Sequence, residues 1–161
     1  ITGGKWTTYR RMAQDTINKA IALGQLSPAK CITETVKIHG SAGKPEQGSF
    51  SFYGSDAEKI REMMKSDPTL AQALHPESSM VKAEVIWMIE NEMARTVEDV
   101  LARRCRLLFL NAGLAGKLAP VVAKIMAEQL SQDDKWIQAQ VQQFEELVGQ
   151  YLLKYQANPA L

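Results

Sequence analysis

The chain has 161 residues, of which 45% are hydrophobic, and this is enough for one domain with a substantial core. Its 19 basic and 18 acidic side chains give a formal net charge of +1, which argues against a nucleic-acid-binding domain that depends on charge. No run of about 18 apolar residues is present, so the sequence predicts no membrane-spanning helix.

The cysteines and histidines do not form a metal-binding pattern. Cys31 and Cys105 lie far apart in the sequence, and only His39 and His75 accompany them, so no zinc site is expected. A reduced, cytosolic context is the default, with a Cys31–Cys105 disulfide as the open alternative. The chain begins at Ile1 without an initiator methionine or a charged leader, and we interpret it as a piece of a longer protein or as a processed one.

The first predicted element is an amphipathic helix over residues 7–23. Apolar side chains recur at helical spacing from Tyr9 to Ile21, and Gly24 is a typical C-terminal stop. Either Thr7 or Thr8 can cap the start of this helix.

Residues 25–55 are predicted to be an extended connection. The segments CITETVKI and GSFSFYG are β-like and partly alternating, so we expect one short strand pair between two helical parts. Helix-breaking residues interrupt the whole stretch, namely Pro28, Gly40, Gly43, Pro45, Gly48 and Gly54.

From residue 56 onward the pattern predicts an all-α domain with short connections. Ser55 and Glu58 have capping-box spacing ahead of a helix that Pro68 ends. Ser79 is expected to cap the next helix.

Later helix boundaries follow from the same signals. Thr96 with Asp99 predicts a helix start, and the helix is expected to continue toward Leu108. The remaining predicted landmarks are a break at Gly113 and Gly116, Pro120 in the first turn of the next helix, and a last helix from about Asp133 to Tyr155 that buries Trp136.

The stretch GGKWTT is the first candidate site. Successive glycine amides can form an anion-binding concavity, a helix start adds unpaired N–H groups, and Lys5 adds a full positive charge. The alternative is a common glycine turn with a threonine cap and a lysine that points to water.

A second candidate is the charged stretch around NEMARTVEDVLARRCR. It would serve either as a contact surface or in acid–base chemistry, or it simply carries ion pairs that stabilise exposed helices. No Ser/His/Asp set and no G-x-G-x-x-G motif is present, so the chain lacks the parts of a complete catalyst. The charged residues of this stretch are Glu90, Glu92, Arg95, Glu98, Asp99, Arg103, Arg104 and Arg106.

Three segments in order, TGGKWTTYRRMAQDT, KCITETVKIHG and EMARTVEDVLARR, resemble the C-terminal part of FAD-dependent glycerol-3-phosphate dehydrogenases. Glycerol-3-phosphate oxidases share this pattern, and the likeness continues through KWIQAQVQQFEELVGQYL. The resemblance implies that residues 1–24 close an FAD-binding domain, that 25–55 form a linker, and that 56–161 form an all-helical C-terminal domain. Most of the FAD-binding part would be missing, and the isolated chain would be inactive.

The resemblance also implies roles for the residues of GGKWTT. Amides at this helix start would stabilise negative charge as it develops on the flavin. Glycines are needed where a Cβ would obstruct the backbone approach, and Lys5 would in addition help to hold the anionic substrate. The residues expected against the cofactor are Gly3, Gly4, Lys5, Trp6 and Thr7.

The parent protein is therefore expected to oxidise sn-glycerol 3-phosphate to dihydroxyacetone phosphate and to pass electrons from FAD to a quinone or to oxygen. The expected partners are its own FAD-binding domain, the substrate and the electron acceptor, and a homo-oligomer is compatible with the sequence. The expected location is the cytoplasm or the inner face of the cytoplasmic membrane, although no strongly basic amphipathic helix establishes attachment. The alternative is a non-catalytic helical module for interaction or scaffolding.

Overall fold

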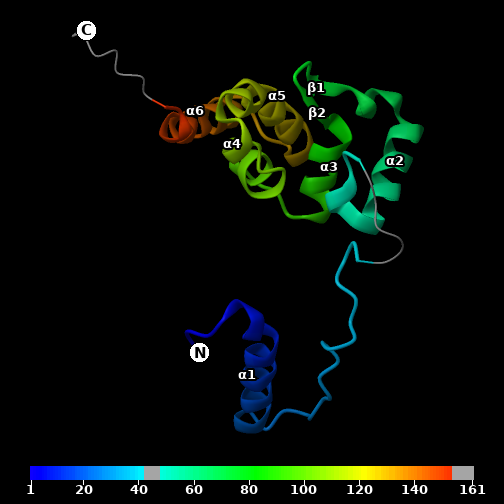
Figure 1. Ribbon diagram of the computed structural model, residues 1–161, viewed down its shortest axis with the longest axis vertical. Helices are drawn as coiled ribbons and strands as arrows, with labels where there is room; N and C mark the ends of the chain where they lie inside the picture. The colour runs from blue at the N-terminus through cyan, green and yellow to red at the C-terminus, as the bar shows by residue number, and fades with distance from the viewer. Residues whose placement is uncertain (42–47, 154–161) are drawn as a thin grey trace, which may run out of the picture. The chain divides into compact units, whose positions relative to one another are not determined.

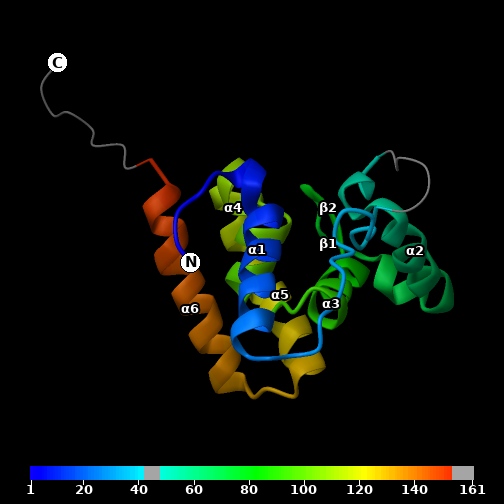
Figure 2. The same cartoon turned by 90° about the horizontal axis from the view of Figure 1, so that it is seen from below.

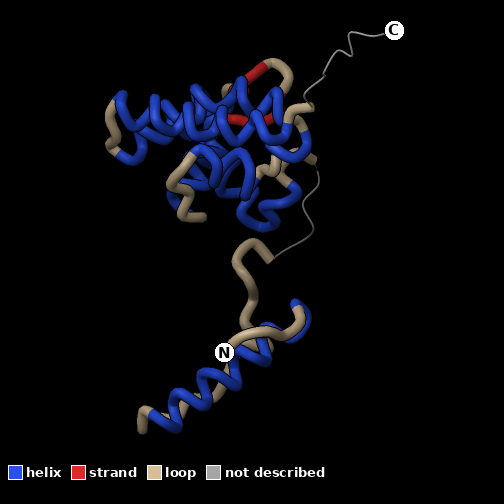
Figure 3. Tube along the Cα trace, turned by 90° about the vertical axis from the view of Figure 1, so that its left-hand side faces the viewer, coloured by secondary structure: helices blue, strands red, loops and turns tan. Residues whose placement is uncertain are grey.

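The computed structural model describes residues 1–41 and 48–153, and it divides the chain into two units, Ile1–Lys44 and Pro45–Leu161 (Figure 1). The predicted helix breakers Gly43 and Pro45, and the predicted end of the last helix at Tyr155, lie outside the described residues. Helices account for most of the described chain (Figure 3), which confirms the all-α prediction.

The first unit contains the predicted N-terminal helix. A short 3-10 helix, η1 (Trp6–Thr8), leads into α1 (Tyr9–Leu23). Gly24 ends α1, and its N–H donates to the Ala20 carbonyl oxygen at 2.8 Å. The 7–23 prediction is therefore confirmed to within the usual uncertainty of helix ends.

The β-like segment CITETVKI does not form a strand. Instead the Ile32 carbonyl oxygen accepts hydrogen bonds from the N–H groups of Thr35 and Val36, both at 3.1 Å, which makes a turn. Its β-branched residues favour a strand, but a strand needs a partner edge, and none of the described residues provides one here.

The second unit begins with a 3-10 turn that the sequence also suggested was β-like. GSFSFYG folds into η2 (Ser51–Asp56), which buries Tyr53, and α2 (Ala57–Ser66) follows. The predicted Ser55–Glu58 capping box is wrong, because α2 begins one residue later than this spacing requires: its N-cap position is Asp56, and no side chain caps it.

A small hairpin follows η3 (Pro68–Ala71), in a region predicted to be helical. Strands β1 (Ala73–His75) and β2 (Ser78–Val81) pair antiparallel. Ser79 therefore lies in a strand and caps nothing, and α3 (Lys82–Asn91) starts only after β2.

The predicted helix start at Thr96 and Asp99 is confirmed. Asp99 Oδ2 accepts from the N–H groups of Arg95 and Thr96, both at 2.9 Å, while Thr96 Oγ1 accepts from the Asp99 N–H at 3.1 Å. The element that follows, η4 (Asp99–Arg104), is a π-helix. It stops before Leu108 because Arg106 adopts a left-handed backbone, with φ of 59°.

The break predicted at Gly113 and Gly116 is wrong. After α4 (Leu107–Leu110), both glycines lie inside α5 (Ala112–Leu130), which the Asn111 side chain caps by accepting from the Leu114 N–H at 3.0 Å. Pro120 consequently lies in the interior of α5 rather than in a first turn, at the cost of one backbone hydrogen bond.

The last helix, α6 (Asp134–Tyr151), packs along α5 (Figure 2). Gly116 faces α6 at this contact, where a Cβ would lie 3.6 Å from Val148 Cγ1, an ordinary van der Waals distance. Trp136 is only half-buried, contrary to prediction, whereas Trp87 is 5% exposed.

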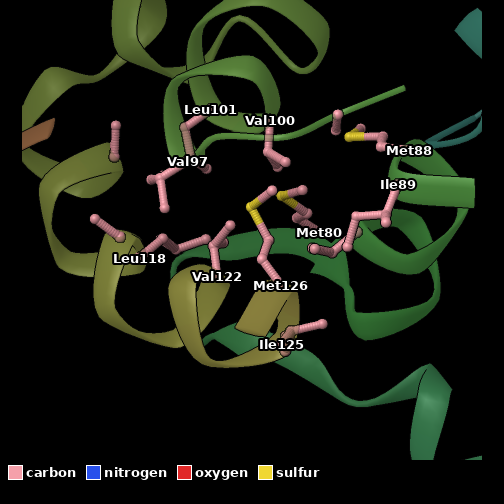
Figure 4. Packing of buried hydrophobic residues seen from close by; sticks show 14 of the residues in the cluster. Met80, Met88, Ile89, Val97, Val100, Leu101, Leu118, Val122, Ile125 and Met126 are labelled. Carbon is pink, nitrogen blue, oxygen red and sulfur yellow. The ribbon is translucent and has the colours of Figure 1, made fainter. Parts of the chain in front are cut away.

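The core of the second unit is formed mainly by α3, η4, α5 and α6. Figure 4 shows buried side chains from β2, α3, η4 and α5 that meet in one cluster. Its labelled members include Met80, Met88, Val97, Leu101, Leu118, Val122 and Met126.

Candidate functional site

The backbone of GGKWTT requires its two glycines. Gly3 and Gly4 adopt φ values of 76° and 100°, a region that residues with a Cβ rarely occupy. Lys5 returns to an extended conformation, and the chain then turns directly into η1. The glycine pair therefore sets the direction from which the helix start is approached.

Thr8 closes this turn through its backbone and its side chain. The Thr8 N–H donates to the Lys5 carbonyl oxygen at 2.9 Å, and Thr8 Oγ1 accepts from the Lys5 N–H at 3.2 Å. The hydroxyl thus bonds back to Lys5 and does not cap α1. Among the residues that the structure describes, the N–H groups of Trp6 and Thr7 have no acceptor.

The Lys5 side chain is exposed and forms no ion pair with any residue of 1–41 or 48–153. The Trp6 ring is 88% exposed and lies beside the Tyr9 ring, with 5.9 Å between the ring centroids. A full positive charge, two unpartnered amides and an aromatic ring therefore gather in one short stretch.

Four of the five predicted site residues line one hollow of about 540 Å³. Gly3, Gly4, Lys5 and Trp6 form one side of it, and the face of α1 from Tyr9 to Ile17 forms the other. Thr7 is not part of the lining. A Cβ at Gly4 would come within 2.2 Å of Met12 Sδ, whereas a Cβ at Gly3 would meet nothing within 4 Å.

These features suit an anionic ligand with a flat, partly apolar body. The ammonium and the amides supply positive electrostatic potential, and the apolar wall of α1 suits a ring system. The residues present therefore fit the edge of a flavin.

The second candidate stretch is built from caps and ion pairs. Arg103 lies 2.7 Å from Glu98 and 2.9 Å from Asp99, and Arg104 lies 3.4 Å from Glu92. Burial opposes ionisation of Asp99, but hydrogen bonds from Arg95 and Thr96, together with the Arg103 charge, lower its pKa overall. A carboxylate held ionised in this way is a poor proton donor, which favours the structural interpretation.

The two histidines lie apart from both candidates. His75 is the last residue of β1, and its Nδ1 accepts from the Glu77 N–H at 3.1 Å. His39 lies in a turn of the first unit.

Sequence reasoning missed a buried polar pair. Tyr53 Oη donates to Glu84 Oε1 at 3.2 Å, and Glu84 Oε2 accepts from the Val81 N–H at 2.8 Å. Burial raises the pKa of both side chains. The available signal was the single carboxylate in the otherwise apolar run AEVIWMI, which places Glu84 on the buried face of α3.

The described part of the chain shows no metal site, no disulfide and no membrane-spanning helix. No three metal-ligating side chains come together in residues 1–41 and 48–153, and Cys31 and Cys105 are free thiols. None of the described helices combines the length and the apolar character that crossing a bilayer requires.

Comparisons with known proteins give the family. Glycerol-3-phosphate dehydrogenase SDP6 of Arabidopsis thaliana is 29% identical over 92% of this chain and 28% of its own length. A probable mitochondrial glycerol-3-phosphate dehydrogenase of Caenorhabditis elegans is 33% identical, over 81% of the chain and 21% of its own length. The mitochondrial glycerol-3-phosphate dehydrogenase of Homo sapiens is 32% identical, over 88% of the chain and 22% of its own length.

The chain thus spans about a fifth to a quarter of the length of these relatives. No solved structure matches it significantly. Residues 47–137, more than half of the chain, match the family model described as the C-terminal domain of alpha-glycerophosphate oxidase. The chain therefore belongs to this family of C-terminal domains.

Proposed function

We propose that the full-length protein is an FAD-dependent oxidoreductase that converts sn-glycerol 3-phosphate to dihydroxyacetone phosphate. The observation that carries the proposal is the similarity of 81–92% of this chain to proteins named glycerol-3-phosphate dehydrogenases. Because the chain spans only 21–28% of their length, most of the catalytic machinery belongs to the rest of the protein. The isolated chain is accordingly proposed to be inactive.

The reaction removes a hydride from C2 of glycerol 3-phosphate and a proton from the C2 hydroxyl group, and leaves a ketone. FAD, when bound, would accept the hydride. The groups of this chain that would face the cofactor are the N–H groups of Trp6 and Thr7, which have no acceptor among the described residues. They would donate to the edge of the ring system where negative charge develops, and such donors lower the barrier because they act more strongly as the charge grows.

Lys5 would serve both the cofactor and the substrate. Its ammonium has no described counter-ion, so it is available to an external anion. A point charge beside the site would hold the phosphate-bearing substrate and reinforce the amides of the helix start. Gly3 and Gly4 would keep this approach free of side chains.

The electron acceptor and the location are part of the proposal. A quinone and oxygen are the two acceptors that the family resemblance implies, and parallel assays of quinone reduction and oxygen uptake separate them. The proposed location is the cytoplasm or the inner face of the cytoplasmic membrane, whereas the relatives from Caenorhabditis elegans and Homo sapiens carry the word mitochondrial in their names. Fractionation of cells before and after a salt wash tests it.

The function is tested with the full-length protein. It should retain FAD through purification, reduce an artificial electron acceptor when glycerol 3-phosphate is added, and release dihydroxyacetone phosphate in equal amount. Glycerol without the phosphate is the control substrate. Retention of FAD without oxidation of glycerol 3-phosphate would refute the substrate, and a folded protein without FAD would refute the cofactor.

A further inference from the structure

Thr8 holds the N–H group and the carbonyl group of Lys5 at the same time. Its Oγ1 accepts from the Lys5 N–H at 3.2 Å and donates to the Lys5 carbonyl oxygen at 3.0 Å. The Thr8 N–H donates to the same carbonyl oxygen at 2.9 Å. A hydroxyl group can donate one hydrogen bond and accept others, so its two contacts to Lys5 are compatible. One residue therefore restrains the Lys5 backbone on both sides of its Cα.

The backbone before Lys5 offers no comparable restraint of its own. Gly3 and Gly4 adopt φ values of 76° and 100°. Glycine has access to more backbone conformations than any other residue, so two glycines in succession would let the direction of the chain at Lys5 vary. The hydrogen bonds from Thr8 fix Lys5 from its C-terminal side instead.

Met12, one turn further along α1, supports this arrangement. Its Sδ lies 3.5 Å from Thr8 Oγ1 and occupies the space beside Gly4, where a Cβ would come within 2.2 Å of it. A thioether is a weaker acceptor than a carbonyl oxygen, so the single hydroxyl proton of Thr8 goes to Lys5. Met12 thus packs against the glycine, while Thr8 makes the polar contacts.

These bonds also decide which groups remain for a ligand. Thr8 uses the Lys5 N–H, whereas the N–H groups of Trp6 and Thr7 have no acceptor among the described residues. Lys5 can therefore serve an anion only through its ammonium. The ammonium ends a flexible four-carbon stem, so the position of the Lys5 backbone determines which space the charge can reach.

We infer that Thr8 is a positioning residue, whose hydroxyl fixes the Lys5 backbone so that the Lys5 ammonium meets the anionic substrate from a defined direction. This role rests on the proposed function, in which Lys5 holds that substrate. Thr8 acts only through Lys5 and contacts neither the substrate nor the cofactor. A backbone that is already ordered loses less conformational freedom when the substrate binds, which favours binding.

Hydrogen exchange of the Lys5 amide tests the geometry without turnover. In the full-length protein, measured at the resolution of single amides, Thr8→Val should make the Lys5 N–H exchange about threefold faster or more, because valine has the shape of threonine without its hydroxyl. Thr8→Ser keeps the hydroxyl and should retain the exchange rate of the wild type. Equal exchange in Thr8→Val and in the wild type would overturn the inference.

Thr35 provides a matched control. The Ile32 carbonyl oxygen accepts from the Thr35 N–H at 3.1 Å and from the Thr35 hydroxyl at 3.2 Å, the same spacing as between Lys5 and Thr8. Both threonines are exposed, so neither valine variant disturbs a core. Thr35→Val should change neither the exchange of the Lys5 amide nor kcat/KM. Losses as large as those of Thr8→Val would show a general effect of losing a turn hydrogen bond, against a specific role of Thr8.

Kinetics of the full-length, FAD-containing protein test whether Thr8 acts through Lys5. Thr8→Val should lower kcat/KM for glycerol 3-phosphate by about threefold to tenfold, and Thr8→Ser should restore most of it. When Lys5→Ala is already present, Thr8→Val should cause no further loss, because the group that it positions is gone. Losses that multiply in the double variant would contradict the inference, since Thr8 would then act independently of Lys5.

The two measurements separate the inference from the proposed function. If the full-length protein ignored glycerol 3-phosphate while Thr8→Val, and not Thr8→Ser, accelerated exchange of the Lys5 amide, the function would fail and the hold of Thr8 on Lys5 would stand. If the protein were active while Thr8→Val changed neither the exchange nor kcat/KM, the positioning role would fail and the function would stand.

Discussion

Lys5 combines a full charge, an exposed position and the absence of a described counter-ion, at a point where the backbone offers two N–H groups without acceptors. The first N–H groups of a helix have no acceptor within the helix, so those of Trp6 and Thr7 are open to an external acceptor beside the Lys5 ammonium. The turn hydrogen bonds between Lys5 and Thr8 fix the backbone, so the ammonium extends from a defined point.

Replacing Lys5 tests its proposed role. In the full-length protein Lys5→Ala should lower kcat/KM for glycerol 3-phosphate by about tenfold to a hundredfold, since a charge-assisted contact to an anion is lost. Steady-state kinetics with an artificial acceptor measure the effect. Lys19→Ala, which removes an exposed lysine from α1, is the control and should leave kcat/KM unchanged. Identical kinetics of the two variants would remove Lys5 from the site.

Glu84 is a buried carboxyl group, and its burial should make the stability of the protein depend on pH. It is 4% exposed and has two donors, the Tyr53 hydroxyl and the Val81 N–H, but no cation among the described residues bonds to it. Burial raises its pKa from the ordinary value of 4.5. In the pH range between the unfolded and folded pKa values the folded chain binds more protons than the unfolded chain, so stability falls as pH rises.

Glu84→Gln should remove this pH dependence. The glutamine amide keeps an acceptor for the Val81 N–H and carries no charge. The free energy of unfolding of the variant should therefore increase relative to that of the wild type as pH rises from about 4.5 toward neutrality. Denaturant unfolding of the chain at several pH values, followed by circular dichroism, measures the difference. The control is Glu90→Gln, an exposed position on the same helix. A pH-independent difference between Glu84→Gln and wild type would show that Glu84 titrates normally.

Among the elements, the start of η4 depends most on a single side chain. Asp99 accepts from two backbone amides and pairs with Arg103, while Glu98 next to it only pairs with Arg103. At the other end of η4, the left-handed residue Arg106 separates it from α4.

Asp99→Ala should therefore lower the free energy of unfolding by about 1–3 kcal/mol, because it leaves two amides without acceptors. Glu98→Ala should cost less than about 1 kcal/mol, as is usual for an exposed ion pair. Urea denaturation of both variants makes the comparison. If Glu98→Ala were the more damaging change, charge and not capping would hold this helix start.

The tryptophans of α3 and α6 differ in burial, so we expect them to contribute unequally to the stability of the core. Trp87 on α3 is 5% exposed, whereas Trp136 at the start of α6 is half-buried. Trp87→Ala should cost about 3–5 kcal/mol and Trp136→Ala less than about 2 kcal/mol. Equal losses in thermal or urea unfolding would mean that Trp136 is buried in solution.

The helices were predictable because each has a local signal: apolar periodicity in α1, α3 and α6, and the Thr96–Asp99 pattern at η4. The secondary-structure predictions failed where contacts with residues distant in the sequence determine the local conformation. Gly116 looks like a helix breaker, but it lies inside α5, which packs against α6. CITETVKI has strand-forming residues but gains no strand partner, while the hairpin at Ala73–Val81 forms from residues without a clear strand pattern.

The candidate site was predictable to a similar degree. The two glycines, Lys5 and the helix start are consecutive, so the sequence alone shows them together. The pairing of Arg10 with Glu34, and hence the placement of residues 29–38 beside α1, joins residues 24 positions apart and has no local signal. The same holds for Tyr53 and Glu84, which only the packing of η2 on α3 brings together.

For the whole molecule, the division into two units and the family match agree on its organisation. The helical unit that begins at Pro45 coincides with the family's C-terminal domain from residue 47, and the unit Ile1–Lys44 holds the candidate cofactor-facing residues. Function would then arise only in the complete protein, where the first unit joins the missing FAD-binding part.

GGKWTT is proposed to face a flavin that glycerol 3-phosphate reduces. The most direct test of this proposal is anaerobic titration of the full-length, FAD-containing protein with glycerol 3-phosphate, followed by visible absorbance, for wild type and Lys5→Ala. We predict stoichiometric bleaching of the flavin in the wild type and a markedly slower or weaker response in Lys5→Ala. An absorbance spectrum that glycerol 3-phosphate leaves unchanged, although dithionite bleaches it, would show that this flavin does not oxidise glycerol 3-phosphate.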